Sequence, residues 1–569
     1  EKGQPTTALI PEIVQTALDK LPIPKRMRWG DLDAQFVRPV QWVVLLFGDE
    51  VIDAEILSVK SGRESRGHRF HHPDTIYIPQ PSEYEVLLES EGRVIADFDR
   101  RRETVRARIE EVAAKSGGVA VIDEALLDEV NAMVEWPVPV LGRFEEHFLD
   151  VPQEALISTM KANQKYFHLV DKQGKLLPYF ITISNVDSKD MDKVREGNER
   201  VIRPRFADAE FFWNQDRKHK LEEHIESLKT VVFQKELGTL YDKSMRVSQL
   251  AGDIAKQLGS DKQQAQRAAM LSRCDLMSEM VYEFPELQGI MGRYYAAYDR
   301  EPGDIAQALD EFYMPRIAGD ELPQTQTGQA IALAERIDTL VGIFGIGQPP
   351  TGSKDPFALR RAALGTLRIL IENHLDLDIE ALIEQAVSLL KDRLTAKDAG
   401  KQVFEFLMER LRAYYQDRGV AHDSYEAVRE VKPASPMDFD DRIRAVSAFR
   451  QMAEAESLAA ANKRISNILK KAEVKIPAKY SDKLLQDSEE KELAKQLEAV
   501  SKKVEPLLAK HDYESAMKAM AGLRDVVDAF FDKVMVMAED EKLRDNRLAL
   551  LNQLRNLFLG VADISVLQQ

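Results

Sequence analysis

Apolar residues recur at steps of three and four through most of the chain after residue 208, whereas before that point they come in short runs. Steps of three and four place side chains on one face of a helix, and short runs bounded by turn residues are typical of strands. The pattern therefore predicts an α+β region followed by mostly α-helical domains. Long amphipathic helices are expected at residues 235–300, 327–345, 356–375, 378–393 and 401–417, and from Phe439 to the end.

The strand-like runs lie between residues 31 and 190. Residues 40–47 predict a buried strand that ends at Gly48, and residues 51–59 predict a second strand. Residues 171–174, Asp-Lys-Gln-Gly, are typical of a hairpin turn. Further strands are expected at 75–78, 138–141, 166–170 and 179–184, with helices at 12–20, 82–90 and 100–116.

The length of 569 residues indicates several domains, because a single core rarely extends so far. The prolines of residues 21–30 favour an extended linker, with a basic arm that touches RNA as the alternative. Residues 433–436 indicate a late linker, and residues 470–491 a polar loop. The predicted division is a linker at 1–30, an α+β domain at 31–215, and helical domains at 216–375, 376–436 and 437–569.

The formal net charge is −17, which argues against a protein that coats nucleic acid non-specifically but leaves room for a local basic surface. Cys274 is the single cysteine, so neither an internal disulfide nor a cysteine-rich zinc site is possible, as expected in a reducing cytoplasm. No apolar run approaches the roughly 20 residues that a membrane span needs. The chain begins at Glu1 rather than Met, and we expect that a natural N-terminal portion is missing.

The last sixty residues combine an apolar stripe with a basic helix. The stripe recurs at steps of three and four and is expected to be buried; its members are Leu523, Val527, Phe530, Val534 and Met537. Arg544, Arg547 and Arg555 recur on the next helix and predict a local basic face for a polyanion.

The segment FFDKVMVMAEDEKLRDNRLALLNQL and the ending ADISVLQ resemble the helical anticodon-binding domain of several aminoacyl-tRNA synthetases. The resemblance is greatest to the beta subunit of bacterial glycyl-tRNA synthetase. Residues 283–295, 352–362 and 202–213 are similar to the same family. The resemblance implies that the C-terminal helices grip the anticodon stem-loop. The candidate tRNA contacts there are Arg544, Asn546, Arg547 and Arg555, supported by Asp532 and by Phe531, for which core packing is the alternative.

Two further pairs of arginines are candidate tRNA contacts. Arg203 and Arg205 precede the aromatic residues 211–213, and arginines with aromatic rings can pair phosphates and stack bases. Packing at a domain junction is the alternative for those aromatic residues. Arg360 and Arg361 follow Asp355-Pro356, which predicts a helix N-cap with proline at the first helical position. A well-capped helix with solvated arginines is the alternative for that pair.

Residues 246–255 and 268–271 resemble the helices of HD-type metal phosphohydrolases, which bind metal through histidine and aspartate. This chain offers Lys243 and Asp275 near the ligand positions, so a degenerate HD-like domain without metal is expected. Three histidines, His68, His71 and His72, could hold zinc or could form a polar loop that touches a partner or RNA, and the loop is the preferred interpretation because no cysteine is near.

No ATP-binding synthetase core is visible, and residues 342–347 are interpreted as the glycine-rich end of a helix rather than a phosphate loop. The resemblance implies why: in that family the alpha subunit carries glycine and ATP with magnesium, and the beta subunit binds tRNA(Gly) within an α2β2 ligase. No catalytic residue, metal or cofactor is then expected on this chain, and its first domain is expected to resemble that of phenylalanyl-synthetase beta subunits. An HD-family phosphohydrolase and a non-enzymatic RNA-binding scaffold are the alternatives.

Overall fold

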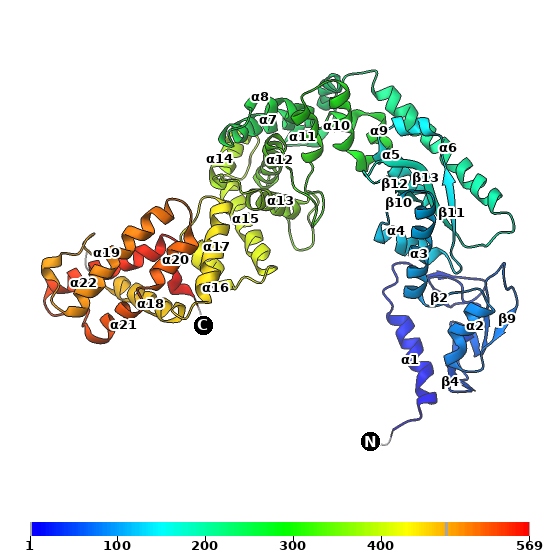
Figure 1. Cartoon of the computed structure of the whole chain (residues 1–569), viewed down its shortest axis with the longest axis horizontal. Helices are drawn as coiled ribbons and strands as arrows, with labels where there is room; N and C mark the ends of the chain where they lie inside the picture. The colour runs from blue at the N-terminus through cyan, green and yellow to red at the C-terminus, as the bar shows by residue number, and fades with distance from the viewer. Residues whose placement is uncertain (1–2, 473–475, 568–569) are drawn as a thin grey trace. The chain divides into compact units, whose positions relative to one another are not determined.

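The computed structural model describes residues 3–472 and 476–567, and the chain divides into two compact units, Glu1–Asp216 and Arg217–Gln569 (Figure 1). Helices predominate, as the sequence predicts, and the sheets are small. Among the described residues, no helix is both long enough and apolar enough to cross a membrane.

Unit 1 contains short strands and a few helices. Its helices are α1 Thr6–Lys20, α2 Tyr84–Ser90, α3 Phe98–Lys115, α4 Glu124–Met133, α5 Gln153–Ser158 and α6 Met191–Asp216. Its strands are β1 Met27–Arg28, β2 Gln35–Phe36, β3 Val43–Val44, β4 Leu46–Phe47, β5 Glu50–Val51, β6 Glu55–Ile56, β7 Val59–Gly62, β8 Glu64–Arg66, β9 Thr75–Tyr77, β10 Val119–Ala120, β11 Val138–Arg143, β12 Phe167–Val170 and β13 Leu176–Ser184.

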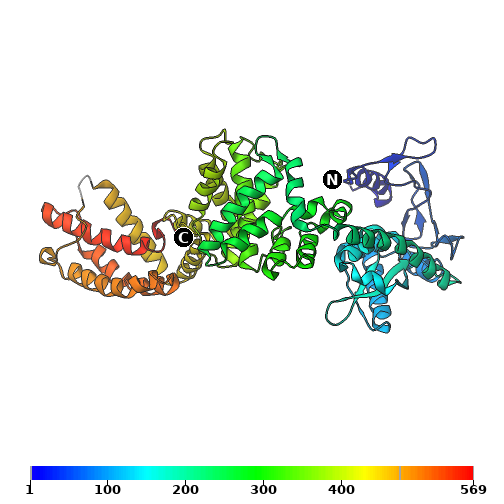
Figure 2. The same cartoon turned by 90° about the horizontal axis from the view of Figure 1, so that it is seen from above.

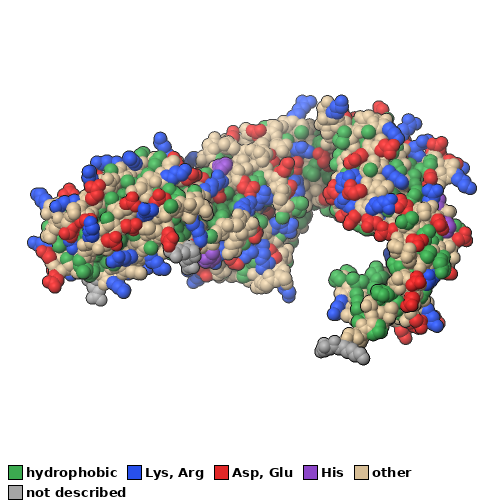
Figure 3. Space-filling model, turned by 60° about the horizontal axis from the view of Figure 1, so that its bottom comes forward, with side chains coloured by type: hydrophobic (Ala, Val, Ile, Leu, Met, Phe, Trp, Pro, Cys, Tyr) green, Lys and Arg blue, Asp and Glu red, His purple; other side chains and the backbone are tan. Residues whose placement is uncertain are grey.

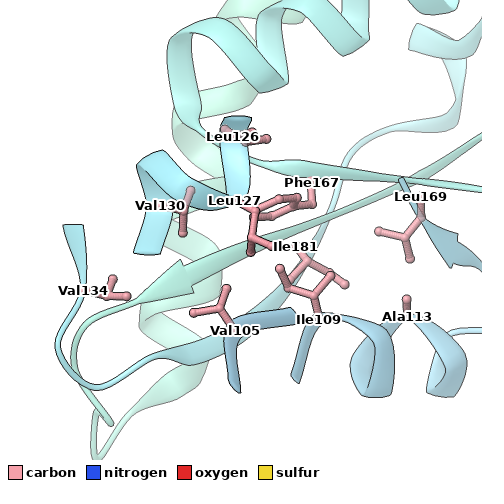
Figure 4. Packing of buried hydrophobic residues seen from close by; sticks show 10 residues of the cluster. All are labelled: Val105, Ile109, Ala113, Leu126, Leu127, Val130, Val134, Phe167, Leu169 and Ile181. Carbon is pink, nitrogen blue, oxygen red and sulfur yellow. The ribbon is translucent and has the colours of Figure 1, made fainter. Parts of the chain in front are cut away.

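The main core of unit 1 lies between a four-stranded antiparallel sheet and helices α3 and α4. The strand order is β10-β12-β13-β11. Figure 4 shows how side chains from both helices meet the strands, with Leu127 and Ile109 facing Phe167 and Ile181, all fully buried. The predicted hairpin joins β12 to β13, and the Asp171 carboxylate accepts hydrogen bonds from the backbone N–H groups of Gln173 and Lys175. Burial alternates along β12, where Phe167 and Leu169 are buried, as expected for a strand with one face on the core.

The predictions for residues 40–47 and 51–59 are wrong in part. Each predicted strand is broken into two-residue pieces, and the side chains of Trp42 and Phe47 are 43% and 50% exposed. A turn at Gly48, whose φ is +61°, brings β5 straight back onto β4. A continuous apolar run in the sequence is compatible with a buried strand and also with an apolar surface that the rest of unit 1 does not cover.

Unit 2 is almost entirely helical. Its helices are α7 Leu240–Gln257, α8 Lys262–Leu271, α9 Glu279–Glu283, α10 Ile290–Tyr298, α11 Gly303–Glu311, α12 Gln326–Gly345, α13 Leu359–Glu372, α14 Ile379–Leu390, α15 Ala399–Gln416, α16 His422–Arg429, α17 Pro436–Arg450, α18 Ala455–Lys471, α19 Ser488–Leu508, α20 Tyr513–Ala521, α21 Arg524–Lys533 and α22 Glu541–Leu559. Its strands are β14 Val232–Gln234 and β15 Gly238–Thr239.

Most helix predictions for unit 2 are confirmed, including those for α12, α14 and α15. The predicted glycine-rich helix end is confirmed too: Gly347, with φ +74°, follows α12, and its N–H donates to the Phe344 carbonyl. The expected loop at 470–491 lies partly outside the described residues, at 473–475. The late linker at 433–436 is short, because Ser435 already caps α17 and Pro436 is its first residue.

The start of α13 differs from its prediction. The helix begins at Leu359, so Pro356 is not its first residue, and Ala358 before it is left-handed with φ +53°. Asp355 still satisfies the open helix end, because its carboxylate accepts the backbone N–H groups of Leu359 and Arg360 at 2.8 and 3.0 Å. The prediction that Asp355 caps this helix is therefore confirmed, but the predicted first residue of the helix is wrong.

A buried ionic cluster joins α7 to α12. The Lys243 ammonium donates to Asp338 at 2.9 Å, and Arg246 donates to both oxygens of the same carboxylate at 2.7 and 3.2 Å. All three side chains are less than 10% exposed. Burial alone would raise the pKa of Asp338, but the two cations outweigh it and lower that pKa.

The cluster extends to a second carboxylate. Glu335, one turn before Asp338, lies 3.4 Å from the Lys243 ammonium and also pairs with Arg273. Arg273 donates to the Ser244 hydroxyl as well, and its guanidinium lies over the Phe312 ring. Three cations therefore share two carboxylates at the centre of unit 2.

Asp275 is buried apart from this cluster. It lies in the turn Cys274–Met277, and its carboxylate faces the start of α10. Its Oδ2 accepts the backbone N–H groups of Gly289 and Gly292 at 2.6 and 3.0 Å. Gly289 has φ +84°, and a Cβ there would lie 2.5 Å from the Tyr313 ring, so only glycine fits. Burial raises the pKa of Asp275 to about 6 although both N–H groups oppose the shift.

Replacing the shared carboxylate should strongly destabilise unit 2. Asp338→Asn leaves Arg246 buried without its counter-charge and Lys243 with Glu335 alone, which costs about 3–5 kcal/mol. Denaturant unfolding followed by circular dichroism measures the loss. Glu514→Gln, which breaks an exposed helical pair with Lys518, is the matched control and should leave the midpoint unchanged. Equal midpoints for the two variants would contradict the assigned role of Asp338.

Removing the titratable group at position 275 should change the pH dependence of stability. The folded-state pKa of about 6 lies above the ordinary value of 3.8. The wild type therefore loses stability, relative to Asp275→Asn, as pH rises from about 4 to about 6, by about 3 kcal/mol. Calorimetric melting temperatures of both proteins between pH 4.5 and 7.5 measure this difference. A constant difference across that range would exclude the raised pKa.

Candidate nucleic-acid interface

The C-terminal helices α17–α22 pack into one bundle, in which α18 lies against α21 and α22, and α19 lies against α20, α21 and α22 (Figures 1 and 2). Leu523, Val527, Phe530 and Val534 of the predicted stripe are buried. Met537 is 54% exposed, so the expectation that it is buried with the stripe is wrong. The reason is that α21 ends at Lys533 and Met537 lies in the loop before α22.

Arg547 is not part of a basic surface, so that expectation is wrong. Its side chain is 5% exposed and pairs with the fully buried Glu490 and, at 2.7 Å, with Asp487. It also donates to the Met535 carbonyl at 2.6 Å. The guanidinium therefore ties α22 to the start of α19 and to the loop before α22, and it is a structural residue of the bundle.

Asn546 is also buried, at 5% exposure, so the expectation that it lies on a tRNA-binding surface is wrong as well. Its amide binds the backbone of Ser481 through both groups: the oxygen accepts the Ser481 N–H at 2.6 Å, and the nitrogen donates to the Ser481 carbonyl at 3.2 Å. This pair anchors the polar loop between α18 and α19 onto α22. An asparagine so engaged has no amide group left to read a base.

Arg544 and Arg555 lie nearer the surface of α22. The Arg544 guanidinium pairs with Asp545 at 3.0 Å, and its side chain is 20% exposed. Arg555 donates to the Ser466 hydroxyl of α18 at 3.0 Å and lies 3.5 Å from Asp563. Both cations are thus partly neutralised, and the face that the sequence predicted as basic has little free charge.

Phe531 and Asp532 lie at the end of α21. The Phe531 ring is half-buried and meets Phe530 edge to face at a centroid distance of 5.5 Å. Its other contact is Arg464 of α18, whose guanidinium lies 4.5 Å from the ring centroid. Asp532 is exposed. Phe531 therefore packs on the bundle and also supports a cation at its surface.

Arg203 and Arg205 lie on α6, a 26-residue helix with Pro204 inside it that the sequence analysis missed. Both arginines are exposed; Arg203 pairs with Glu145 at 2.5 Å. The neighbouring aromatic residues differ in exposure: Trp213 is 7% exposed, on the buried face of the helix, whereas Phe211 is 61% exposed. Arg203, Arg205 and Phe211 are thus exposed positions of α6.

Arg360 and Arg361 occupy the first turn of α13. Arg360 donates to the Gly352 carbonyl at 2.7 Å and lies 3.9 Å from Asp355, so it closes the loop before the helix. Arg361 is exposed and reaches the Arg316 carbonyl at 3.4 Å. The structure thus supports the capped-helix alternative for Arg360 and leaves Arg361 at the surface.

The histidine cluster organises a loop. The Nδ1 atom of the buried His68 lies within 3.3 Å of the backbone N–H groups of Phe70 and His71, and His71 Nε2 accepts the Asp187 N–H at 3.0 Å. Burial and the neighbouring His68 lower the pKa of His71. No group of three potential metal ligands occurs among the described residues, here or beside Asp275.

Acidic and basic side chains are interspersed over the molecular face drawn in Figure 3, as expected for an acidic chain with many surface ion pairs. The sequence analysis missed one group of cations on α18: Lys463, Arg464, Lys470 and Lys471, all exposed. A signal for them was present, because the two basic pairs are seven residues apart and so fall on one helical face.

The comparisons with known proteins agree with this geometry. The family model described as glycyl-tRNA synthetase beta subunit matches residues 1–430, and the model described as DALR anticodon binding domain matches residues 458–564. The second match begins in α18 and includes α19–α22.

Sequence relatives include proteins from three bacteria. The glycine–tRNA ligase beta subunit of Marinobacter nauticus is 55% identical over the whole of this chain, which covers 82% of that protein. The corresponding protein of Azotobacter vinelandii is 56% identical, with 83% of its length covered, and that of Pseudomonas putida is 55% identical, with 82% covered. A chain with this extent of identity, and with a matching anticodon-binding bundle, belongs to the glycyl-tRNA synthetase beta subunit family.

Proposed function

We propose that the chain is the tRNA-binding subunit of a glycine–tRNA ligase, in which a separate alpha subunit forms the glycyl-adenylate. The observation that carries this proposal is the match of an anticodon-binding domain to α18–α22, a bundle whose buried ion pairs and capped helices make it a rigid platform. Rigid helices hold contact residues in a fixed register on an RNA backbone.

The proposed partners are the alpha subunit, in an α2β2 assembly, and tRNA(Gly). The proposed cofactor is ATP with magnesium, bound on the alpha subunit, and the proposed compartment is the cytoplasm. Cys274 is a buried free thiol, which suits a reducing compartment.

The proposed domain division is the one predicted from the sequence: 31–215, 216–375, 376–436 and 437–569, after a linker. We propose that the first domain resembles that of phenylalanyl-synthetase beta subunits and the second is a degenerate HD-like domain. The ionic cluster supports the loss of metal chemistry in the second, because Lys243, Arg246 and Arg273 concentrate positive charge on α7 and beside it. A divalent cation would be repelled there.

Because Arg547 and Asn546 are buried, the candidate tRNA contacts that we retain are the exposed or partly exposed arginines. In the C-terminal bundle these are Arg544 and Arg555, with Phe531 and Asp532 in support. The remaining candidates are Arg203 and Arg205 on α6 and Arg360 and Arg361 on α13. Arg203, Arg544 and Arg555 could contact phosphate by exchanging a surface ion pair, which costs little in water.

The division of labour has a direct test. The purified chain alone should not catalyse glycine-dependent exchange of pyrophosphate into ATP, because it lacks the adenylate site. Adding the alpha subunit should restore exchange, and adding tRNA(Gly) should then give glycyl-tRNA. Exchange catalysed by the chain alone, or a reconstituted complex that does not bind tRNA(Gly) in a filter-binding assay, would exclude the proposal.

Substitutions on α22 should separate folding from RNA binding. Arg547→Gln leaves the buried Glu490 unpaired and should destabilise the bundle by about 3 kcal/mol or more. Arg544→Gln should leave the melting temperature almost unchanged and weaken tRNA binding a few-fold, since one partly exposed cation is lost. Thermal melts and filter binding of both variants measure this. A fully stable Arg547→Gln protein would contradict the burial of that guanidinium.

A further inference from the structure

The exposed face of α18 carries two pairs of cations. Lys463 and Arg464 precede Lys470 and Lys471 by seven residues, so the pairs lie two turns apart on one side of the helix. Asn467 lies between them, and all five side chains are exposed. The opposite side of α18 packs on α21 and α22 (Figure 1), so the basic face points out of the bundle.

The four cations of this face are not neutralised. To the described residues, the four make no ion pair and no side-chain hydrogen bond. Arg544, Arg547 and Arg555 on α22 are all paired with carboxylates. The sequence of α18 contains a single acidic residue, Glu456, two turns before the first basic pair. A local group of four uncompensated cations in a chain of net charge −17 forms a positive field that attracts a polyanion.

A stabilising effect on the helix does not account for the whole face. Lys470 and Lys471 are in the last turn of α18, where cations interact favourably with the helix dipole. Lys463 and Arg464 lie two turns earlier, beyond the reach of that effect. The Arg464 guanidinium rests on the Phe531 ring at 4.5 Å, which orients the side chain without neutralising its charge.

We infer that this face of α18 binds the phosphate backbone of the tRNA, and the inference rests on the proposed function. The two pairs are separated by about 10 Å along the helix, from seven residues at about 1.5 Å each. A strand of duplex DNA places one phosphate per roughly 3.4 Å of axis, so a span of this size matches phosphates a few nucleotides apart on one strand. Asn467, between the pairs, can donate to a phosphate or ribose oxygen. The principal cationic contact of the bundle is therefore on α18 rather than on α22.

The test uses the complex of the full chain with its alpha subunit. Lys470→Gln with Lys471→Gln, and separately Lys463→Gln with Arg464→Gln, each remove two charges. Affinity for tRNA(Gly) is measured by filter binding between 50 and 300 mM salt. Each double variant should lower the slope of log affinity against log salt by about 1.5 and weaken binding roughly tenfold at the lowest salt.

The control is Lys502→Gln with Lys503→Gln on α19, an equally exposed adjacent pair, of which Lys502 is already bound to Glu498. It should leave the salt slope unchanged, and all three variants should elute as the complete complex with unchanged melting temperatures. An unchanged slope for both α18 variants would overturn the inference while leaving tRNA binding intact. Loss of the alpha subunit instead of tRNA would overturn it in favour of a protein interface. Failure of the wild-type complex to bind tRNA(Gly) would overturn the proposed function as well.

Discussion

The sharing of Asp338 between Lys243 and Arg246 is the interaction on which the centre of unit 2 depends. Removing three charged groups from water is expensive, and only close ion pairs with satisfied hydrogen bonds offset that cost. The pairing fixes how α7 lies on α12, the longest buried helix of this unit. A misaligned packing would leave a buried charge alone, so the cluster selects one arrangement among those that hydrophobic contacts would permit.

The same cluster supports the proposal that residues 216–375 resemble HD-type metal hydrolases without their metal chemistry. Such enzymes need neutral imidazoles and carboxylates whose lone pairs converge on a cation. Here Lys243 and Arg273 bind the carboxylates of Asp338 and Glu335 themselves. Asp275, the one ligand-like residue, is directed to the backbone of Gly289 and Gly292. The carboxylates of this region hold helices together, which suits a subunit that positions RNA.

The C-terminal bundle repeats this use of buried charge at a second place. Arg547 and Glu490 join α22 to α19, and Arg442 of α17 donates to the carbonyls of Gly560 and Val561 at the end of α22. Arg547 is one of the arginines that the sequence predicted as an RNA contact, whereas Arg442 was not among them. The cations of α18 have no such partners and stay exposed to solvent. Within one small domain, tertiary contacts thus separate arginines that stabilise the fold from cations that are free to bind a ligand.

The sequence by itself determined most helices of unit 2, three strands and the hairpin of the main sheet of unit 1, and the family, because periodicity and long characteristic strings depend on local order along the chain. It could not determine which charged residues are buried. Arg544 and Arg547 are three residues apart on one helix, and only the approach of Glu490, 57 residues away, buries the second. The uncovered strands at 43–51, the register of α13 and the free basic face of α18 were likewise decided by tertiary packing, since burial and ion pairing depend on neighbours that are distant in sequence.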